Sequence, residues 1–146
     1  MNDSFRVNQK IPDSGPLPEP ENPTEAREYL KAAAFPAPTL DEVTMVGDEF
    51  TSVCPKTGQP DFGVVTIRYT PGLHCIESRS LKYYLWSYRS EPAFCEALAA
   101  RIADDVVYAI DPKAVEVEVE QAPRGGVQIT ARASRGRGGG SGSARP

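Results

Sequence analysis

The pattern of apolar and polar positions predicts β-strands in the middle and near the end of the chain. The segments 43–46, 50–53 and 64–69 are rich in β-branched and aromatic residues. The segment 115–120, VEVEVE, alternates strictly, so one face of that strand is apolar and the other carries three carboxylates. After a turn marked by two glycines, residues 127–132 return as a further strand.

Between these pairs of strands, the apolar residues recur at the spacing of a helix. One helix is predicted over Leu81–Tyr88, with Ser80 as its N-cap. A second helix is predicted to begin at Ser90, with Pro92 in its first turn, and to stop at Asp111. The order is therefore two strands, two helices and two strands (ββααββ). This order predicts an α+β fold, a four-stranded antiparallel sheet with two helices on one face.

Changes of composition set the predicted domain boundaries. Residues 1–39 hold half of the fourteen prolines and are expected to form an extended N-terminal arm that contributes little to the core. Within the arm, the amphipathic stretch 24–30 predicts a helical turn or two on the surface. Residues 40–133 form the compact domain. Residues 134–146, rich in Gly, Arg and Ser, predict a disordered tail, and a solvated tail is favoured over one that contacts RNA.

Charge and cysteine content narrow the class of protein. The 16 basic and 20 acidic residues give a formal charge of −4. The sequence lacks the large cluster of basic residues that would predict a nucleic-acid partner. The apolar runs are too short to span a membrane, and the N-terminus shows no secretory signal. The three cysteines fit neither a disulfide framework nor a zinc motif, and His74 is the lone histidine. We therefore expect no metal site and a cytoplasmic location.

The predicted compact domain is small for a stable monomer. It holds only about 95 residues, and its sheet has two open edges that invite pairing with other copies. A ring-forming homo-oligomer is therefore expected.

The stretch 54–61, CPKTGQPD, carries the first candidate chemistry. Its prolines and glycine predict a tight loop that holds Cys54 and Asp61 facing one another. A thiol can attack an electrophilic carbon while a carboxylic acid moves the proton. A half-buried structural thiol beside a turn-forming aspartate is the alternative, and on these eight residues alone it is the favoured one, because buried free cysteines are common.

Two further motifs change that balance: residues 77–89, ESRSLKYYLWSYR, and Phe94-Cys95-Glu96. Together with Cys54 and Asp61, and in this order, they resemble the QueF family over about residues 45–132. The members of that family are NADPH-dependent reductases that convert 7-cyano-7-deazaguanine to 7-aminomethyl-7-deazaguanine, on the route to queuosine in tRNA. The resemblance implies the tunnelling fold, assembled as rings stacked head to head with active sites between subunits.

Carried over by resemblance, Cys54 is the nucleophile and Asp61 its proton partner. Thiolate attack would turn the nitrile into a covalent thioimide, which accepts hydride readily. A free thiol with a pKa of about 8.5 is only a few per cent ionised at neutral pH. A neighbour that takes its proton therefore makes more of the reactive thiolate available. Reduction to an amine needs four electrons, hence two NADPH in succession.

The resemblance also implies a substrate site. Glu96 would accept the two neighbouring N–H groups of a guanine-like edge, although a first-turn glutamate stabilised by the helix dipole is the alternative. The remaining residues of this expected site are Ile76, Glu77, Ser78 and Cys95.

The implied NADPH site comprises Arg79, Ser80, Lys82 and Arg124. The family usually has lysine at position 79, and arginine keeps the charge there while adding the ability to bind phosphate with two N–H groups. A solvated basic helix start is the alternative for the first three residues. A plain hairpin turn is the alternative for Arg124.

Cys95 departs from the family pattern, because histidine usually occupies this position. Loss of a general acid or base can cost on the order of a hundredfold in rate. Cys95 is interpreted either as a weaker proton donor or as a partner that forms a reversible disulfide with Cys54 and guards it against over-oxidation.

Two other functions remain open. One is a transferase that forms the thioimide and then lets an amine attack it, as relatives acting on tRNA do. The retained Arg79-Ser80-Leu81-Lys82 segment argues against it, because the transferase needs no NADPH. The other is a non-catalytic module that binds a purine or RNA, which the retention of both Cys54 and Asp61 disfavours.

Overall fold

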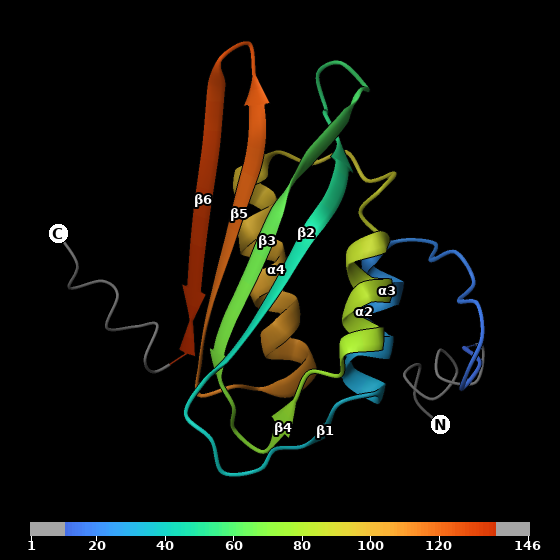
Figure 1. Cartoon of the computed structure of the whole chain (residues 1–146), viewed down its shortest axis with the longest axis vertical. Coiled ribbons are helices and arrows are strands. Elements are labelled where there is room, and N and C mark those ends of the chain that lie inside the picture. Colours follow the sequence, from blue (N-terminus) through green and yellow to red (C-terminus); the bar gives the residue numbers. More distant parts are fainter. Residues whose placement is uncertain (1–10, 137–146) are drawn as a thin grey trace, which may run out of the picture.

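The computed structural model describes residues 11–136 of the chain. Its main feature is a four-stranded antiparallel sheet in the order β2-β3-β5-β6. The strands are β2 (Val43–Val53), β3 (Pro60–Thr70), β5 (Ala114–Arg124) and β6 (Val127–Arg135). Figure 1 shows these long strands side by side, with helix α4 (Cys95–Ile110) behind them. The predicted α+β fold is confirmed.

The first two strands are longer than the sequence predicted. The predicted segments 43–46 and 50–53 belong to one strand, whose pairing with β3 shifts register between Gly47 and Phe50. A shift of this kind is typical of a β-bulge, which hides the continuity of a strand in the sequence pattern.

The last two strands follow the predicted alternation. Val115, Val117 and Val119 are buried against helix α4, which packs on β5 and β6. The connection between the strands is made by Gly125 and Gly126, both at positive φ, which a two-residue hairpin turn requires. Strand β6 extends to Arg135, past the start of the predicted tail, and residues 137–146 of that tail lie outside the described residues.

Helix α3 (Ser78–Trp86) begins two residues before the predicted cap. The side chain of Glu77 accepts hydrogen bonds from the backbone N–H groups of Arg79 and Ser80, so Glu77 is the N-cap. The prediction of Ser80 as N-cap is wrong, because its hydroxyl instead donates to the Glu77 carbonyl at 2.8 Å.

Helix α4 begins later than predicted. Pro92 lies outside it in an isolated bridge with Val53, and Phe94 is the N-cap. The apolar residues at helical spacing on α4, Leu98, Ile102, Val106 and Ile110, are buried, whereas Phe94 before the helix is exposed. The helix ends as predicted at Asp111, which adopts a positive φ of 44°.

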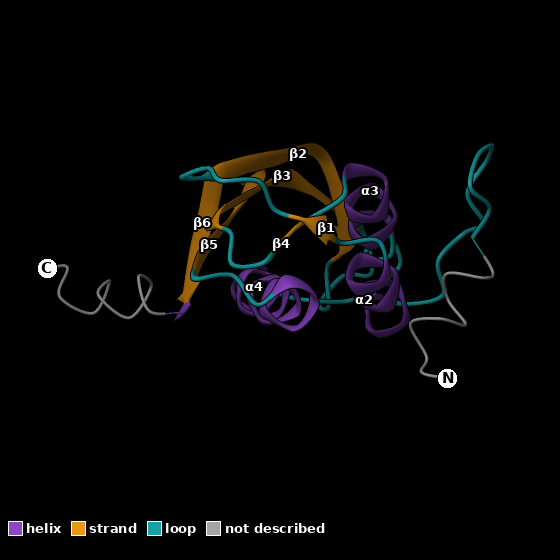
Figure 2. Cartoon of the chain, turned by 90° about the horizontal axis from the view of Figure 1, so that it is seen from below, coloured by secondary structure: helices purple, strands orange, loops and turns teal. Residues whose placement is uncertain are grey.

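The N-terminal region contributes more to the core than expected. Helix α2 (Pro23–Ala32) is ten residues long and is capped by the side chain of Asn22, and its Ala26, Tyr29 and Leu30 belong to the hydrophobic core. It packs on α3 and α4, as Figure 2 shows. The expectation of a surface turn that contributes little core is therefore wrong here, although the division into arm, domain and tail stays a prediction.

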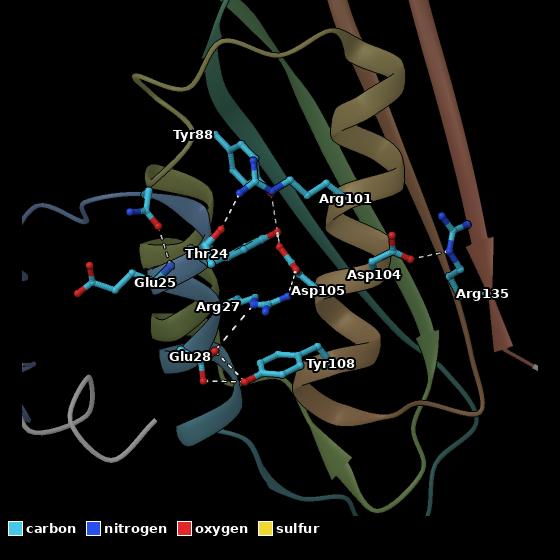
Figure 3. Close-up of polar contacts among 12 residues, drawn as sticks. Thr24, Glu25, Arg27, Glu28, Tyr88, Arg101, Asp104, Asp105, Tyr108 and Arg135 are labelled. Carbon is cyan, nitrogen blue, oxygen red and sulfur yellow. Dashed lines mark hydrogen bonds and ion pairs between the residues drawn. The ribbon is translucent and has the colours of Figure 1, made fainter. Parts of the chain in front are cut away.

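A buried polar cluster joins α2 to the other helices. Asp105 of α4 is about 5% exposed; it accepts hydrogen bonds from Arg27 of α2, at 3.1 Å, and from Tyr84 of α3. One helical turn away, Arg101 donates to Thr24 at 3.0 Å. Figure 3 shows this cluster between α2 and α4. The cluster fixes α2 against the core, since each buried charge has a partner of opposite charge.

The remaining elements form a second, two-stranded sheet of β1 (Phe35–Pro36) and β4 (His74–Cys75). In Figure 1 this sheet lies at the bottom, at the opposite end from the β2–β3 loop and the β5–β6 turn. Within residues 11–136, no helix is long and apolar enough to cross a membrane.

Candidate active site

Cys54 lies in the loop directly after β2. Its backbone N–H donates to Gln59 at 2.8 Å, and its carbonyl accepts from Gly58 at 2.9 Å, so the loop is closed on itself. Gly58 has a positive φ of 73°, which favours glycine. Hydrogen bonds from the Thr57 hydroxyl and from the backbone of Lys56 and Thr57 lower the pKa of the Cys54 thiol. The partly exposed sulfur is therefore more easily ionised than an ordinary cysteine.

Asp61 lies near the start of β3, on the other side of the same loop. Its pairing partner on β2 is Ser52, two residues before Cys54. The carboxylate is about 5% exposed, and its Oδ1 accepts a hydrogen bond from Arg124 Nη1 at 2.8 Å. The negative charge of Asp61 acts to raise the pKa of Cys54, against the larger effect of the hydrogen bonds. The loop thus brings the thiol and the acid to one end of the sheet.

Cys95 and Glu96 open helix α4 at the same end. The Cys95 thiol is buried and donates to the carbonyl of Val119, with 3.4 Å between sulfur and oxygen. Burial, and secondly the charge of Glu96, raise its pKa. Cys95 is therefore a neutral thiol at neutral pH, and Glu96 is exposed in the first helical turn. The three cysteines are free.

The predicted site residues thus fall into two groups. Cys54, Asp61, Cys95, Glu96 and Arg124 gather where the β2–β3 loop, the α4 start and the end of β5 meet. The charges of Asp61 and Arg124 both act on the pKa of Cys95, which places them near each other. This group lies at the top of Figure 1.

The second group lies at the start of helix α3, after β4. It comprises Ile76, Glu77, Ser78, Arg79, Ser80 and Lys82. The buried Ile76 N–H donates to the Tyr69 hydroxyl at 2.9 Å, near the far end of β3. Burial raises the pKa of Tyr69 to about 12, so its hydroxyl stays protonated. Tyr69 therefore fixes the position of this segment, a role that no pattern in the sequence indicated.

The two groups are far apart within one chain. Asp61 and Tyr69 lie eight residues apart on β3, which corresponds to about 27 Å at the rise of an antiparallel strand.

A groove of about 810 Å³ runs along α3 beside the edge strand β2. Ser78 and Lys82 line it, and so do Trp86 and Arg89, which follow at helical spacing and which the sequence analysis did not single out as site residues. The wall from β2 includes two acidic residues, Asp48 and Glu49. By contrast, the space beside Asp61 is too tight within one chain to admit a water molecule.

Arg79 does not line this groove. Its Nη1 donates to the Tyr29 hydroxyl of α2 at 3.1 Å, and its Nη2 is covered without a hydrogen-bond partner among residues 11–136. In this structure Arg79 therefore joins α2 to the start of α3.

A cysteine of lowered pKa, held in a closed loop next to a buried carboxylate, is typical of enzymes that use a thiol nucleophile. Comparison with known proteins specifies the family. Residues 60–139 match the family model described as QueF-like protein. The chain belongs to this family.

The chain is similar to two proteins named NADPH-dependent 7-cyano-7-deazaguanine reductase. It is 49% identical over 105 residues to one from Anaeromyxobacter sp. (strain Fw109-5), covering 70% of this chain and 86% of the relative. It is 42% identical over 116 residues to one from Thermomicrobium roseum, covering 77% of this chain and 91% of the relative. Among solved structures, the apo form of the archaeosine synthase QueF-Like matches with a TM-score of 0.64 and 26% identity, covering 68% of this chain and 98% of that one.

Proposed function

We propose that this protein reduces the nitrile of 7-cyano-7-deazaguanine to an aminomethyl group with NADPH, in queuosine biosynthesis. The observation that carries the proposal is the relatives' shared name at 42–49% identity over most of their length. The hydrogen bonds that lower the pKa of Cys54 support it independently, because the reaction needs a nucleophile.

The first step would be addition of the thiol across the nitrile. The Cys54 sulfur forms a bond to the nitrile carbon, one π bond of the nitrile breaks, and Asp61 carries the thiol proton to the nitrile nitrogen. Atoms and electrons balance without an oxidant, and the product is a thioimide. The covalent bond to Cys54 would keep the base in place until a first hydride has been added to the thioimide carbon. The carbon–sulfur bond would then break, Cys54 would leave as the thiol, and an imine would remain for the second hydride.

NADPH supplies a hydride in each of two rounds. The groove along α3 fits such a ligand by size, because pockets for small molecules and cofactors measure about 300–1,000 Å³. Lys82 would bind a phosphate group there. Ser80 and Arg79 would support the site from the helix start, and Arg79 would have to exchange its bond with Tyr29 to reach a phosphate.

Glu96 would bind the base. It is exposed at the end of the sheet that holds Cys54, and its two oxygens match two neighbouring N–H donors. Cys95 would lie behind it as a buried neutral thiol. Ile76, Glu77 and Ser78 would line the opposite side of the substrate.

The separation of the two groups supports an active site shared between copies of the chain. We propose that the chain adopts the tunnelling fold and assembles into stacked rings, in which the start of α3 from one copy meets Cys54 of another. The exposed edges β2 and β6 are available for such an assembly. The three free cysteines favour the reducing cytoplasm as its location.

The test is to mix the purified protein with 7-cyano-7-deazaguanine and NADPH and follow cofactor oxidation. Oxidation of two equivalents of NADPH per base, with formation of the amine, is expected. No oxidation by the wild-type protein would contradict the proposal.

One observation favours a second candidate function. The structural match to an archaeosine synthase supports a transferase in which an amine, rather than hydride, attacks the thioimide. A stable adduct at Cys54 that resists NADPH but reacts with ammonia would favour this function over reduction.

A further inference from the structure

Arg124 was expected at the NADPH site, but it lies against Asp61. Its Nη1 is 2.8 Å from Asp61 Oδ1, and the carboxylate is about 5% exposed whereas the arginine side chain is 44% exposed. Within residues 11–136, no other side chain hydrogen-bonds this carboxylate. A charge-assisted bond to a nearly buried carboxylate restricts its orientation strongly.

The end of β5 is built to aim Arg124 at this position. The pairing of β5 with β6 shifts register between Gln121 and Arg124, so the strand changes its course directly before the arginine. The next two residues, Gly125 and Gly126, have φ angles of 59° and 78° and turn the chain back at once. Arg124 is thus the last residue of β5 and reaches over the start of β3.

We propose that Arg124 is a positioning residue for Asp61 in the addition of Cys54 to the nitrile, and not primarily a ligand of NADPH. This inference rests on the proposed function. Arg124 occupies Oδ1 of the carboxylate and leaves Oδ2 to move the proton between sulfur and nitrogen. The positive charge of Arg124 also offsets the negative charge of the buried Asp61 carboxylate while the proton moves from sulfur to nitrogen.

One further observation supports this assignment. Arg124 and Asp61 act in opposite directions on the pKa of Cys95, so the pair lies beside the thiol end of the site.

Adduct formation without NADPH separates the two roles. The protein is mixed with 7-cyano-7-deazaguanine alone, and the rate at which the base is linked to Cys54 is followed by intact-protein mass spectrometry. Arg124→Gln is expected to slow this rate about 10- to 100-fold, because a misplaced proton-transfer group costs about that much. The KM for NADPH of the same variant is expected to change less than about twofold.

Three further variants make the test specific. Arg124→Lys should restore part of the rate, and Arg124→Gln should add almost nothing in an Asp61→Asn background, because the two residues act as a unit. Arg68→Gln is the matched control, since Arg68 on the central strand β3 forms a partly exposed ion pair with Glu116 of β5 and should behave as wild type.

Two results would overturn the inference. If Arg124→Gln forms the adduct at the wild-type rate while the KM for NADPH rises about tenfold, Arg124 is a cofactor ligand. If the effects of Asp61→Asn and Arg124→Gln are additive, the two residues act separately. Failure of the wild-type protein itself to form any adduct would instead overturn the proposed function, and the inference with it.

Discussion

At the scale of single residues, Cys54 and Cys95 are two thiols in opposite environments. Cys54 is partly exposed and its pKa is lowered, first by the Thr57 hydroxyl and then by backbone N–H groups. Cys95 is about 2% exposed and its pKa is raised, first by burial. Only Cys54 combines access with a stabilised thiolate, so it is the one suited to attack a carbon.

Replacement of Thr57 by valine tests this difference. Thr57→Val removes the hydroxyl that stabilises the Cys54 thiolate, so the pKa of Cys54 should rise towards that of a free thiol. The rate of alkylation of Cys54 by iodoacetamide, measured against pH, should show its midpoint at higher pH than in the wild-type protein. Alkylation of Cys95 in unfolded protein serves as the reference. An unchanged midpoint would show that the hydroxyl does not stabilise the thiolate.

The sequence predicted which residues could carry the chemistry, but not all of their contacts. Cys54 and Asp61 were expected on one tight loop; Cys54 lies on it, and Asp61 lies directly after it, at the start of β3. Glu77 was expected at the substrate, yet both of its oxygens cap helix α3 in this structure. Arg124 was assigned from a motif, whereas its ion pair with Asp61 joins residues 63 positions apart. Such long-range partners depend on strand register, which the pattern of a single strand does not give.

At the scale of elements, α2 is the helix whose role the sequence least revealed. Its amphipathic pattern predicted a short surface turn, because the surrounding prolines are typical of extended chain. In the structure, Tyr29 packs edge-on against Tyr83 of α3, with 5.5 Å between ring centres, and Asp105 holds Arg27. Tertiary packing therefore outweighs the local composition, as is common for short amphipathic helices.

Asp105→Ala tests the attachment of α2. The change leaves Arg27 and the buried Tyr84 hydroxyl without their carboxylate, so the free energy of unfolding should fall by about 3 kcal/mol. Urea denaturation measures this loss. Asp104→Ala is the matched control on the same helix, because its ion pair with Arg135 is exposed and should contribute under about 1 kcal/mol. Equal losses for both variants would contradict a structural role for the buried cluster.

At the scale of the whole molecule, the two groups of site residues lie at opposite ends of one chain. The loop at Cys54 is at one end of the sheet, and the segment from Ile76 to Lys82 is at the other. The strand order was predictable from the sequence, since the alternation of 115–120 and the helical stripes are local patterns. The separation of the groups was not, because the direction of α3 relative to β2 is set by packing.

Subunit complementation tests whether two copies share one site. Cys54→Ala and Lys82→Ala should each inactivate the protein when present in every subunit. When the two variants are unfolded, mixed in equal amounts and refolded together, about a quarter of the shared sites should regain both intact groups. NADPH oxidation measures the recovery. If each site is built from one chain, the mixture should stay inactive, and each variant refolded alone serves as the control.

The most direct measurement of the central claim is the mass of the protein after incubation with 7-cyano-7-deazaguanine in the absence of NADPH. We expect a gain equal to one molecule of the base per chain, located at Cys54 by peptide mapping and absent in Cys54→Ala. Adding NADPH should remove the gain and release the amine. No gain in mass, or a gain at a residue other than Cys54, would contradict addition of Cys54 to the nitrile.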